Sequence, residues 1–187
     1  MVCETISQEY KDMIKTAKRK WDESSDEDKD RWHGAMATDV ASFILWWDTL
    51  KAIEQKYSID VWTIARKMRW DWAYAIGQSL AKDYEDPNLK GLYDAFLSGF
   101  EGYCNLEYSE FNNEVMAFRV HRCPCYQHFK DMGKTDDEIK ELAAMFCLAD
   151  AAIMAGFNSK FDVFIPPRLL MRGDSCCIYR VEYKNKT

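Results

Sequence analysis

Apolar residues recur at spacings of three and four along the first hundred positions, a pattern typical of helices that bury one face. In one of these helices the expected core stripe is Val40, Phe43, Ile44, Trp47 and Leu50. The acidic segment 21–30 is too polar for a core, so it is either a solvated connection or the exposed first turn of the next helix. We predict helices over Thr5–Lys20, over Ala35–Tyr57, from a cap at Ser58–Asp60 to Lys82, and from Asp86 to about Tyr103.

The pattern changes to strict alternation between Val115 and Cys123, which predicts a β-strand. Alternation places Arg119, His121 and Cys123 on one face, while the apolar residues between them face the core. Pro124 is expected to end the strand, and a short helix should follow it. A row of guanidinium, imidazole and thiol groups on one face indicates a candidate site.

The segment Thr135–Glu138 has the form of a capping box and therefore predicts the start of a helix. Cys147 and Asp150 lie together on one face of it, beside a core stripe of Ile139, Leu142, Phe146, Ala149 and Ile153. Strands are expected over Phe161–Ile165, Leu169–Met171 and Cys176–Tyr183.

This order of elements predicts an α+β fold, in which an N-terminal helical region packs with a C-terminal antiparallel sheet and two helices. With 48% apolar residues, the 187-residue chain can bury one core without disulfides. We expect a single domain over residues 1–187, mainly helical over 1–110 and α+β over 111–187.

Charge and targeting signals narrow the class of protein. A formal net charge of −6 argues against nucleic-acid binding, because phosphate contacts need a basic surface. No run approaches the roughly 18 apolar residues of a spanning helix, and the N-terminus lacks the pattern of a secretion signal. Seven cysteines, an odd number, suit a reducing compartment. We therefore expect a cytoplasmic protein with reduced thiols, a small-molecule substrate, and no nucleic-acid or membrane partner; a homo-oligomer is left open.

Five of the seven cysteines lie between positions 123 and 177, close to two of the three histidines. One interpretation is a thiolate nucleophile: Cys123, with His121 and Arg119 on its face, fits a thiol whose pKa is lowered by a neighbouring cation. The other is a zinc or iron site, for which the candidate ligands are Cys123, Cys147, Asp150 and His121. The spacing Cys123-x-Cys125 is tighter than the usual two-residue gap, so it is a weak metal signal.

All seven tryptophans lie at or before Trp72. Aromatic side chains at helical spacing usually pack helices together, which is the favoured interpretation. The alternative is that some of them form the wall of an aromatic pocket.

Three short motifs follow one another in the C-terminal part. They are Arg122-Cys123-Pro124 with Tyr126 and Phe129, then Phe146-Cys147-x-x-Asp150, and then Gly173-Asp174-x-x-Cys177-x-Tyr179-Arg180. Together they resemble the L-2-amino-thiazoline-4-carboxylic acid hydrolase family, over roughly residues 114–183. That family is similar in turn to vinyl-reductase type ligand-binding domains, α+β modules that hold small molecules.

The resemblance implies a hydrolase that opens a C–N bond of a cyclic amidine and converts a thiazoline amino acid to an N-carbamoyl amino acid. Its candidate residues, carried over by motif, are Cys123, Cys147, Asp150 and Cys177, with Asp174 in the turn. The alternative is a metal- or small-molecule-binding module of the vinyl-reductase type, without hydrolase activity.

The residues themselves suggest roles for this chemistry. Hydrolysis at a C=N carbon needs a nucleophile, a proton carrier and a group that stabilises charge. Asp150 would protonate the ring nitrogen or orient His121, and Arg119 or Arg122 would bind a carboxylate in a bidentate way. A thiol mechanism requires no cofactor, whereas the metal alternative requires zinc or iron.

Overall fold

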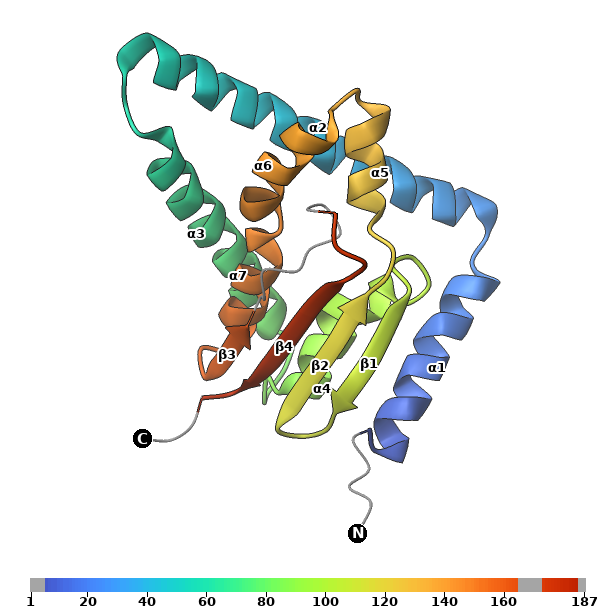
Figure 1. The fold of residues 1–187 in the computed structure, drawn as a ribbon. Helices are drawn as coiled ribbons and strands as arrows, with labels where there is room; N and C mark the ends of the chain where they lie inside the picture. Colours follow the sequence, from blue (N-terminus) through green and yellow to red (C-terminus); the bar gives the residue numbers. More distant parts are fainter. Residues whose placement is uncertain (1–5, 165–172, 185–187) are drawn as a thin grey trace.

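The structure, a computed structural model, describes residues 6–164 and 173–184. Helices surround an antiparallel sheet, and the long second helix crosses over one end of the molecule (Figure 1). The elements are α1 (Gln8–Glu23), α2 (Asp26–Tyr57), α3 (Val61–Ala81), α4 (Leu89–Leu92), the π-helix η1 (Tyr93–Leu97), the 3₁₀-helix η2 (Ser98–Phe100), β1 (Leu106–Phe111), β2 (Val115–Val120), α5 (Pro124–Asp131), α6 (Asp136–Phe146), α7 (Leu148–Phe157), β3 (Phe161–Phe164) and β4 (Cys177–Tyr183).

The four described strands are ordered β1-β2-β4-β3, and every neighbouring pair is antiparallel. In the β2–β4 pair, Phe118 lies opposite Tyr179 and their rings stack with centroids 5.1 Å apart. Val120, the last residue of β2, lies opposite Cys177 at the start of β4. The α+β fold with an antiparallel sheet is therefore confirmed.

Several helix signals read from the sequence are confirmed. The acidic segment ends α1 with residues 21–23 and starts α2 at Asp26, ahead of the predicted Ala35, because the Ser25 side chain accepts a hydrogen bond from the Asp28 amide and caps this helix. Asp60 caps α3 in the same way. The expected core stripe of α6 and α7 is buried at all five positions: Ile139, Leu142, Phe146, Ala149 and Ile153.

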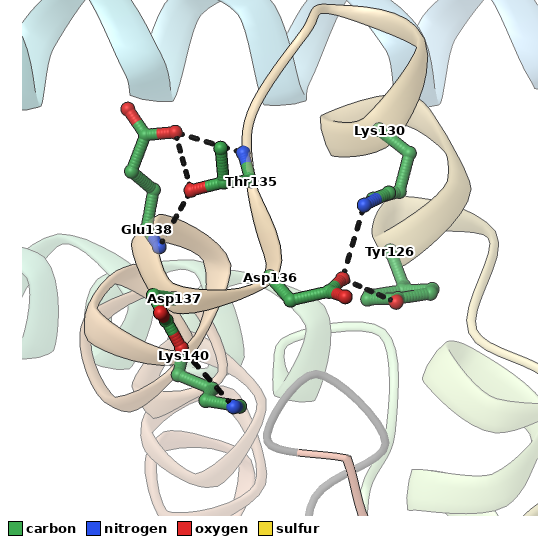
Figure 2. A network of polar contacts seen from close by, with 7 residues as sticks. All are labelled: Tyr126, Lys130, Thr135, Asp136, Asp137, Glu138 and Lys140. Carbon is green, nitrogen blue, oxygen red and sulfur yellow. Dashed lines mark hydrogen bonds and ion pairs between the residues drawn. The ribbon is translucent and has the colours of Figure 1, made fainter.

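The capping box at Thr135 and Glu138 is present, and it belongs to a larger polar network (Figure 2). Asp136, in the first turn of α6, accepts hydrogen bonds from Tyr126 (2.8 Å) and Lys130 (3.1 Å) on α5. These contacts fix α5 against α6, and so they help to hold Cys123, which precedes α5.

Four expectations are corrected. A strand, β1, follows the fourth helix; its alternation is interrupted by an irregularity between Tyr108 and Glu110, which hides its period. The predicted helix from Asp86 to Tyr103 is instead a short α-helix, a π-helix and a 3₁₀-helix. The predicted single helix after Thr135 breaks at Cys147, so this half holds three helices, not two. The strand that was expected to reach Cys123 ends at Val120.

The predicted strand over 169–171 lies outside the described residues. No helix within the described part of the chain is long and apolar enough to cross a membrane.

Helices α3 and α7 touch at two glycines. A Cβ atom on Gly77 would lie 2.0 Å from the carbonyl oxygen of Ile153, and one on Gly156 would lie 2.1 Å from that of Tyr74. Because a backbone atom opposes each glycine, no side chain can move to make room. This contact sets the position of α7 relative to α3, and each of these helices carries a residue of the site described below.

Replacing Gly77 with alanine is therefore expected to lower the free energy of unfolding by about 3 kcal/mol or more, measured by urea denaturation. The matched control is Gly34→Ala in α2, where nothing lies within 4 Å of the added Cβ. It should raise stability by about 1 kcal/mol through helix propensity. Equal effects of the two substitutions would contradict the close approach of α3 and α7.

Candidate active site

A cavity of about 250 Å³ lies between the sheet and the helices. We call it the thiol cavity, because five of the six cysteines that the structure describes line it: Cys104, Cys123, Cys125, Cys147 and Cys177. Most of its remaining wall is apolar or aromatic, with Asp39, Arg69, Asp150 and Tyr179 as the polar exceptions. Cys176, the sixth, is buried but is not among the lining residues.

Cys123 occupies the N-cap position of α5, directly before Pro124 at the first helical position. Hydrogen bonding from the Cys125 thiol lowers the pKa of Cys123, and the backbone amides of Tyr126 and Cys125 at the helix N-terminus act in the same direction. Burial opposes this shift but does not cancel it. The Cys123 side chain makes no regular capping hydrogen bond to α5.

Three other thiols of the cavity have the opposite character. Burial raises the pKa of Cys104 and of Cys147. The pKa of Cys125 is raised mainly because it donates its proton toward Cys123. Of these four cysteines, Cys123 is the one whose environment favours the thiolate.

Asp150 lies in the first turn of α7, and the break in the helix at Cys147 is what creates that turn. Burial raises the pKa of this carboxyl group to about 6, although the Tyr179 hydroxyl donates a hydrogen bond of 2.9 Å to it and Arg69 lies near. A carboxyl group with a pKa close to neutrality can both give and take a proton under ordinary conditions.

Asp150→Asn is expected to change how stability depends on pH. A pKa of about 6 in the folded state exceeds the ordinary value of 3.8 for an aspartate side chain, so the folded state favours the protonated form. The stabilising contribution is complete below pH 3.8 and is lost as pH rises through 6. At pH 7.5 the variant should be more stable than the wild type by up to about 3 kcal/mol. Urea denaturation at pH 4.5 and 7.5 measures this, and an unchanged difference between the two pH values would contradict the raised pKa.

Arg69 on α3 is the residue of this site that the sequence did not suggest. Its guanidinium carbon lies 4.8 Å from the Trp72 ring centroid, 5.2 Å from that of Phe43 and 5.3 Å from that of Phe146. Its Nε atom is buried and has no hydrogen-bond partner among the described residues. A half-buried guanidinium with an unused donor is suited to an anionic ligand group.

A second hollow, of about 490 Å³, adjoins the thiol cavity at Cys123 and Pro124. All three histidines of the chain line it, and we call it the histidine hollow. Its lining residues are His33, His121, Arg122, Cys123, Pro124, Tyr126, Gln127, His128, Gly173 and Asp174. Two residues proposed for substrate binding, Arg122 and Asp174, therefore lie here and not in the thiol cavity.

The expectation that Arg119, His121 and Cys123 share one strand face is wrong. Because β2 ends at Val120, the alternation stops before Cys123. His121 and Arg119 instead contact Glu107 on β1, at 2.6 Å and 3.8 Å. The cause of the lowered pKa of Cys123 is thus the neighbouring thiol and the helix terminus, and not a cation on the same strand.

The proposed metal ligands do not form one set. His121 lines the histidine hollow, whereas Cys147 and Asp150 line the thiol cavity. Within residues 6–164 and 173–184, no group of three or more His, Cys, Asp or Glu side chains is arranged to hold a metal ion.

Comparison with known protein families assigns this chain to one of them. The model of the family described as L-2-amino-thiazoline-4-carboxylic acid hydrolase matches residues 49–181, well over half of the chain. The chain belongs to this family. The resemblance read from the three motifs is thereby confirmed. No curated protein matches the chain.

A solved structure with a similar arrangement is that of trafficking protein particle complex subunit 3 from Naegleria fowleri, covalently bound to palmitic acid. It is 12% identical, covers 79% of this chain and 96% of its own, and superposes with a TM-score of 0.49.

The motifs that identified this L-2-amino-thiazoline-4-carboxylic acid hydrolase family member converge in space. Cys123, Cys147, Asp150 and Cys177 all line the thiol cavity although they span 55 positions. Asp174 is the exception, in the histidine hollow. The family pattern therefore describes one cavity, to which Arg69 adds a cation from outside the motifs.

Proposed function

We propose that this chain is a hydrolase that opens a thiazoline-type amino acid at its amidine carbon, with Cys123 as the nucleophile. The observation that carries the proposal is the joint placement of three groups in one cavity: a thiol with a lowered pKa, a carboxyl group with a pKa of about 6, and a half-buried guanidinium with a buried, unpartnered Nε. They are Cys123, Asp150 and Arg69. Membership of the hydrolase family supports the reaction class.

In the first step the Cys123 thiolate attacks the amidine carbon, and a carbon–sulfur bond forms. The electron pair of the C=N bond moves to the ring nitrogen, which takes the proton of Asp150. The tetrahedral intermediate then expels the ring sulfur as a thiolate. The substrate remains attached to Cys123 through its former amidine carbon, with all its atoms retained.

In the second step the Asp150 carboxylate takes a proton from water, and the resulting hydroxide attacks the same carbon. Collapse to a carbonyl expels the Cys123 thiolate, and the proton of the new hydroxyl group passes through solvent to the released thiolate of the product. One water is consumed, and both Cys123 and Asp150 return to their starting states.

This balance decides which ring bond breaks. An N-carbamoyl product keeps both nitrogens of the amidine. The bond that opens is therefore the one between the amidine carbon and the ring sulfur, in place of the C–N bond expected from the sequence.

Arg69 takes the carboxylate-binding role that the sequence assigned to Arg119 or Arg122. The Nε atom of Arg69 is buried and has no hydrogen-bond partner among the described residues, whereas Arg119 contacts Glu107. The volume of about 250 Å³ also supports a compact substrate, since pockets for drug-sized ligands hold about 300–1,000 Å³.

The direct test is to incubate the protein with L-2-amino-thiazoline-4-carboxylate and to follow the released thiol and the N-carbamoyl product. Arg69→Met is expected to raise KM by about 10- to 100-fold, because the substrate carboxylate loses its charged partner. Cys176→Ala, at a buried cysteine outside the lining of the thiol cavity, is the matched control and should leave the kinetics unchanged.

Tight binding of the thiazoline without any product would contradict the hydrolase and would favour the noncatalytic ligand-binding module. Normal kinetics in Arg69→Met would remove Arg69 from the proposal.

A further inference from the structure

A groove of about 330 Å³ runs between α2 and α3. Its walls are formed by Asp39, Ser42, Phe43, Trp46, Met68, Arg69 and Trp72, so we call it the tryptophan groove. Met68 and Trp72 are each 51% exposed, although both are large and apolar. Two such side chains, one helical turn apart and facing the same groove, form an apolar wall that nothing in the described chain covers.

The tryptophan groove and the thiol cavity share three lining residues: Asp39, Arg69 and Trp72. A ligand in the thiol cavity therefore has the exposed tryptophan groove beside it. At the junction stands Arg69, whose guanidinium lies over the Trp72 and Phe43 rings.

One cation and two acidic groups lie at this junction. Arg69 is the cation that faces both hollows, and its buried Nε has no hydrogen-bond partner among the described residues. Asp39 and Asp150 are the acidic groups that face it from α2 and α7. Because the pKa of Asp150 is raised to about 6, this group is neutral below that pH and does not compete there with an incoming carboxylate.

We propose that the tryptophan groove binds an apolar substituent of the substrate. The substrate class is then a thiazoline-type carboxylate with a short alkyl or aryl group attached beside its carboxylate. The carboxylate contacts Arg69, the ring lies in the thiol cavity, and the apolar group packs between Trp46, Met68 and Trp72. This inference rests on the proposed function for the reacting ring, but the groove and its cation do not depend on it.

The test uses straight-chain carboxylates of two, four, six and eight carbons as probes, with dissociation constants measured by isothermal titration calorimetry. Each methylene that enters the groove is expected to tighten binding about fourfold. The alcohol of each length, which lacks the charge, should bind at least about tenfold more weakly than its carboxylate. Failure of every carboxylate to bind, or affinities independent of chain length, would overturn the proposal.

Two matched variants locate the binding. Met68→Glu places a charge in the tryptophan groove and is expected to abolish the dependence on chain length. Ile64→Glu makes the same kind of change one turn earlier on α3, at a residue that is 48% exposed but does not line the groove, and should leave the dependence intact. If the dependence persists in Met68→Glu, or is lost in both variants, the binding is elsewhere and the proposal is wrong.

Arg69→Met separates the anion from the apolar contact. It is expected to remove the preference for carboxylate over alcohol while the chain-length dependence remains. An undiminished preference in this variant would overturn the role of Arg69 at the junction.

These experiments distinguish a failure of ligand binding in the tryptophan groove from a failure of thiazoline hydrolysis. Chain-length-dependent binding without hydrolysis of any thiazoline would retain the tryptophan groove as a ligand site and contradict the hydrolase. Hydrolysis of the unsubstituted thiazoline without such binding would retain the hydrolase and contradict the groove.

Discussion

Replacing Cys123 with alanine is expected to lower the turnover of L-2-amino-thiazoline-4-carboxylate by about 10³-fold or more. The reason is that its surroundings lower the pKa of Cys123, whereas burial raises those of Cys104 and Cys147. Loss of a covalent nucleophile usually costs at least this much. The measurement is kcat from product formation under saturating substrate.

The matched control is Cys147→Ala, which removes a thiol from the same cavity. If Cys147 only shapes the cavity, its loss should alter KM more than kcat. Circular dichroism and thermal unfolding should show both variants folded, since removal of one sulfur atom costs about 1 kcal/mol. A normal kcat in Cys123→Ala, or a 10³-fold loss of kcat in Cys147→Ala alone, would show that Cys123 is not the nucleophile.

A break at about pH 6 is expected in the pH dependence of kcat/KM. The first step needs the Cys123 thiolate together with protonated Asp150. Below pH 6 the thiolate fraction alone sets the slope of log(kcat/KM) against pH. Above pH 6 the loss of the Asp150 proton lowers that slope by one unit.

Asp150→Asn tests the assignment of this break. The variant should be slower by about 10²- to 10⁴-fold, as expected for loss of a general acid and base. Its profile should show no change of slope at pH 6, because the thiolate fraction alone then sets the slope. A break at pH 6 that survives in Asp150→Asn would belong to another group.

The helices were predictable where the signal is local. A cap such as Asp60 or the Thr135–Glu138 box depends on side chains that lie within three residues of the amides they bind, and each is present. The break at Cys147 was not predictable in this way, because its φ of −72° and ψ of −10° remain close to helical values and the sequence around it favours helix throughout. That small departure nevertheless creates the helix terminus next to Asp150.

The site was predictable only in part. Cys123, Cys147, Asp150 and Cys177 could be singled out because they fall in three ordered motifs. Arg69 could not, since it stands on an aromatic-rich helix and reaches the cavity only through the packing of α3 on α7. The prediction that His121 and Cys123 share one strand face was wrong for a local reason, because β2 ends three residues earlier than expected.

The central claim, covalent attack by Cys123 inside the thiol cavity, can be measured by mass spectrometry of acid-quenched turnover mixtures after trypsin digestion. Cleavage after Arg122 and Lys130 releases a peptide that holds Cys123 and Cys125 and no other cysteine. We expect this peptide to carry the added mass of one intact substrate, on Cys123, since ring opening retains every substrate atom. Steady turnover at the wild-type rate by Cys123→Ala, with no adduct on the wild-type peptide, would contradict covalent attack by Cys123.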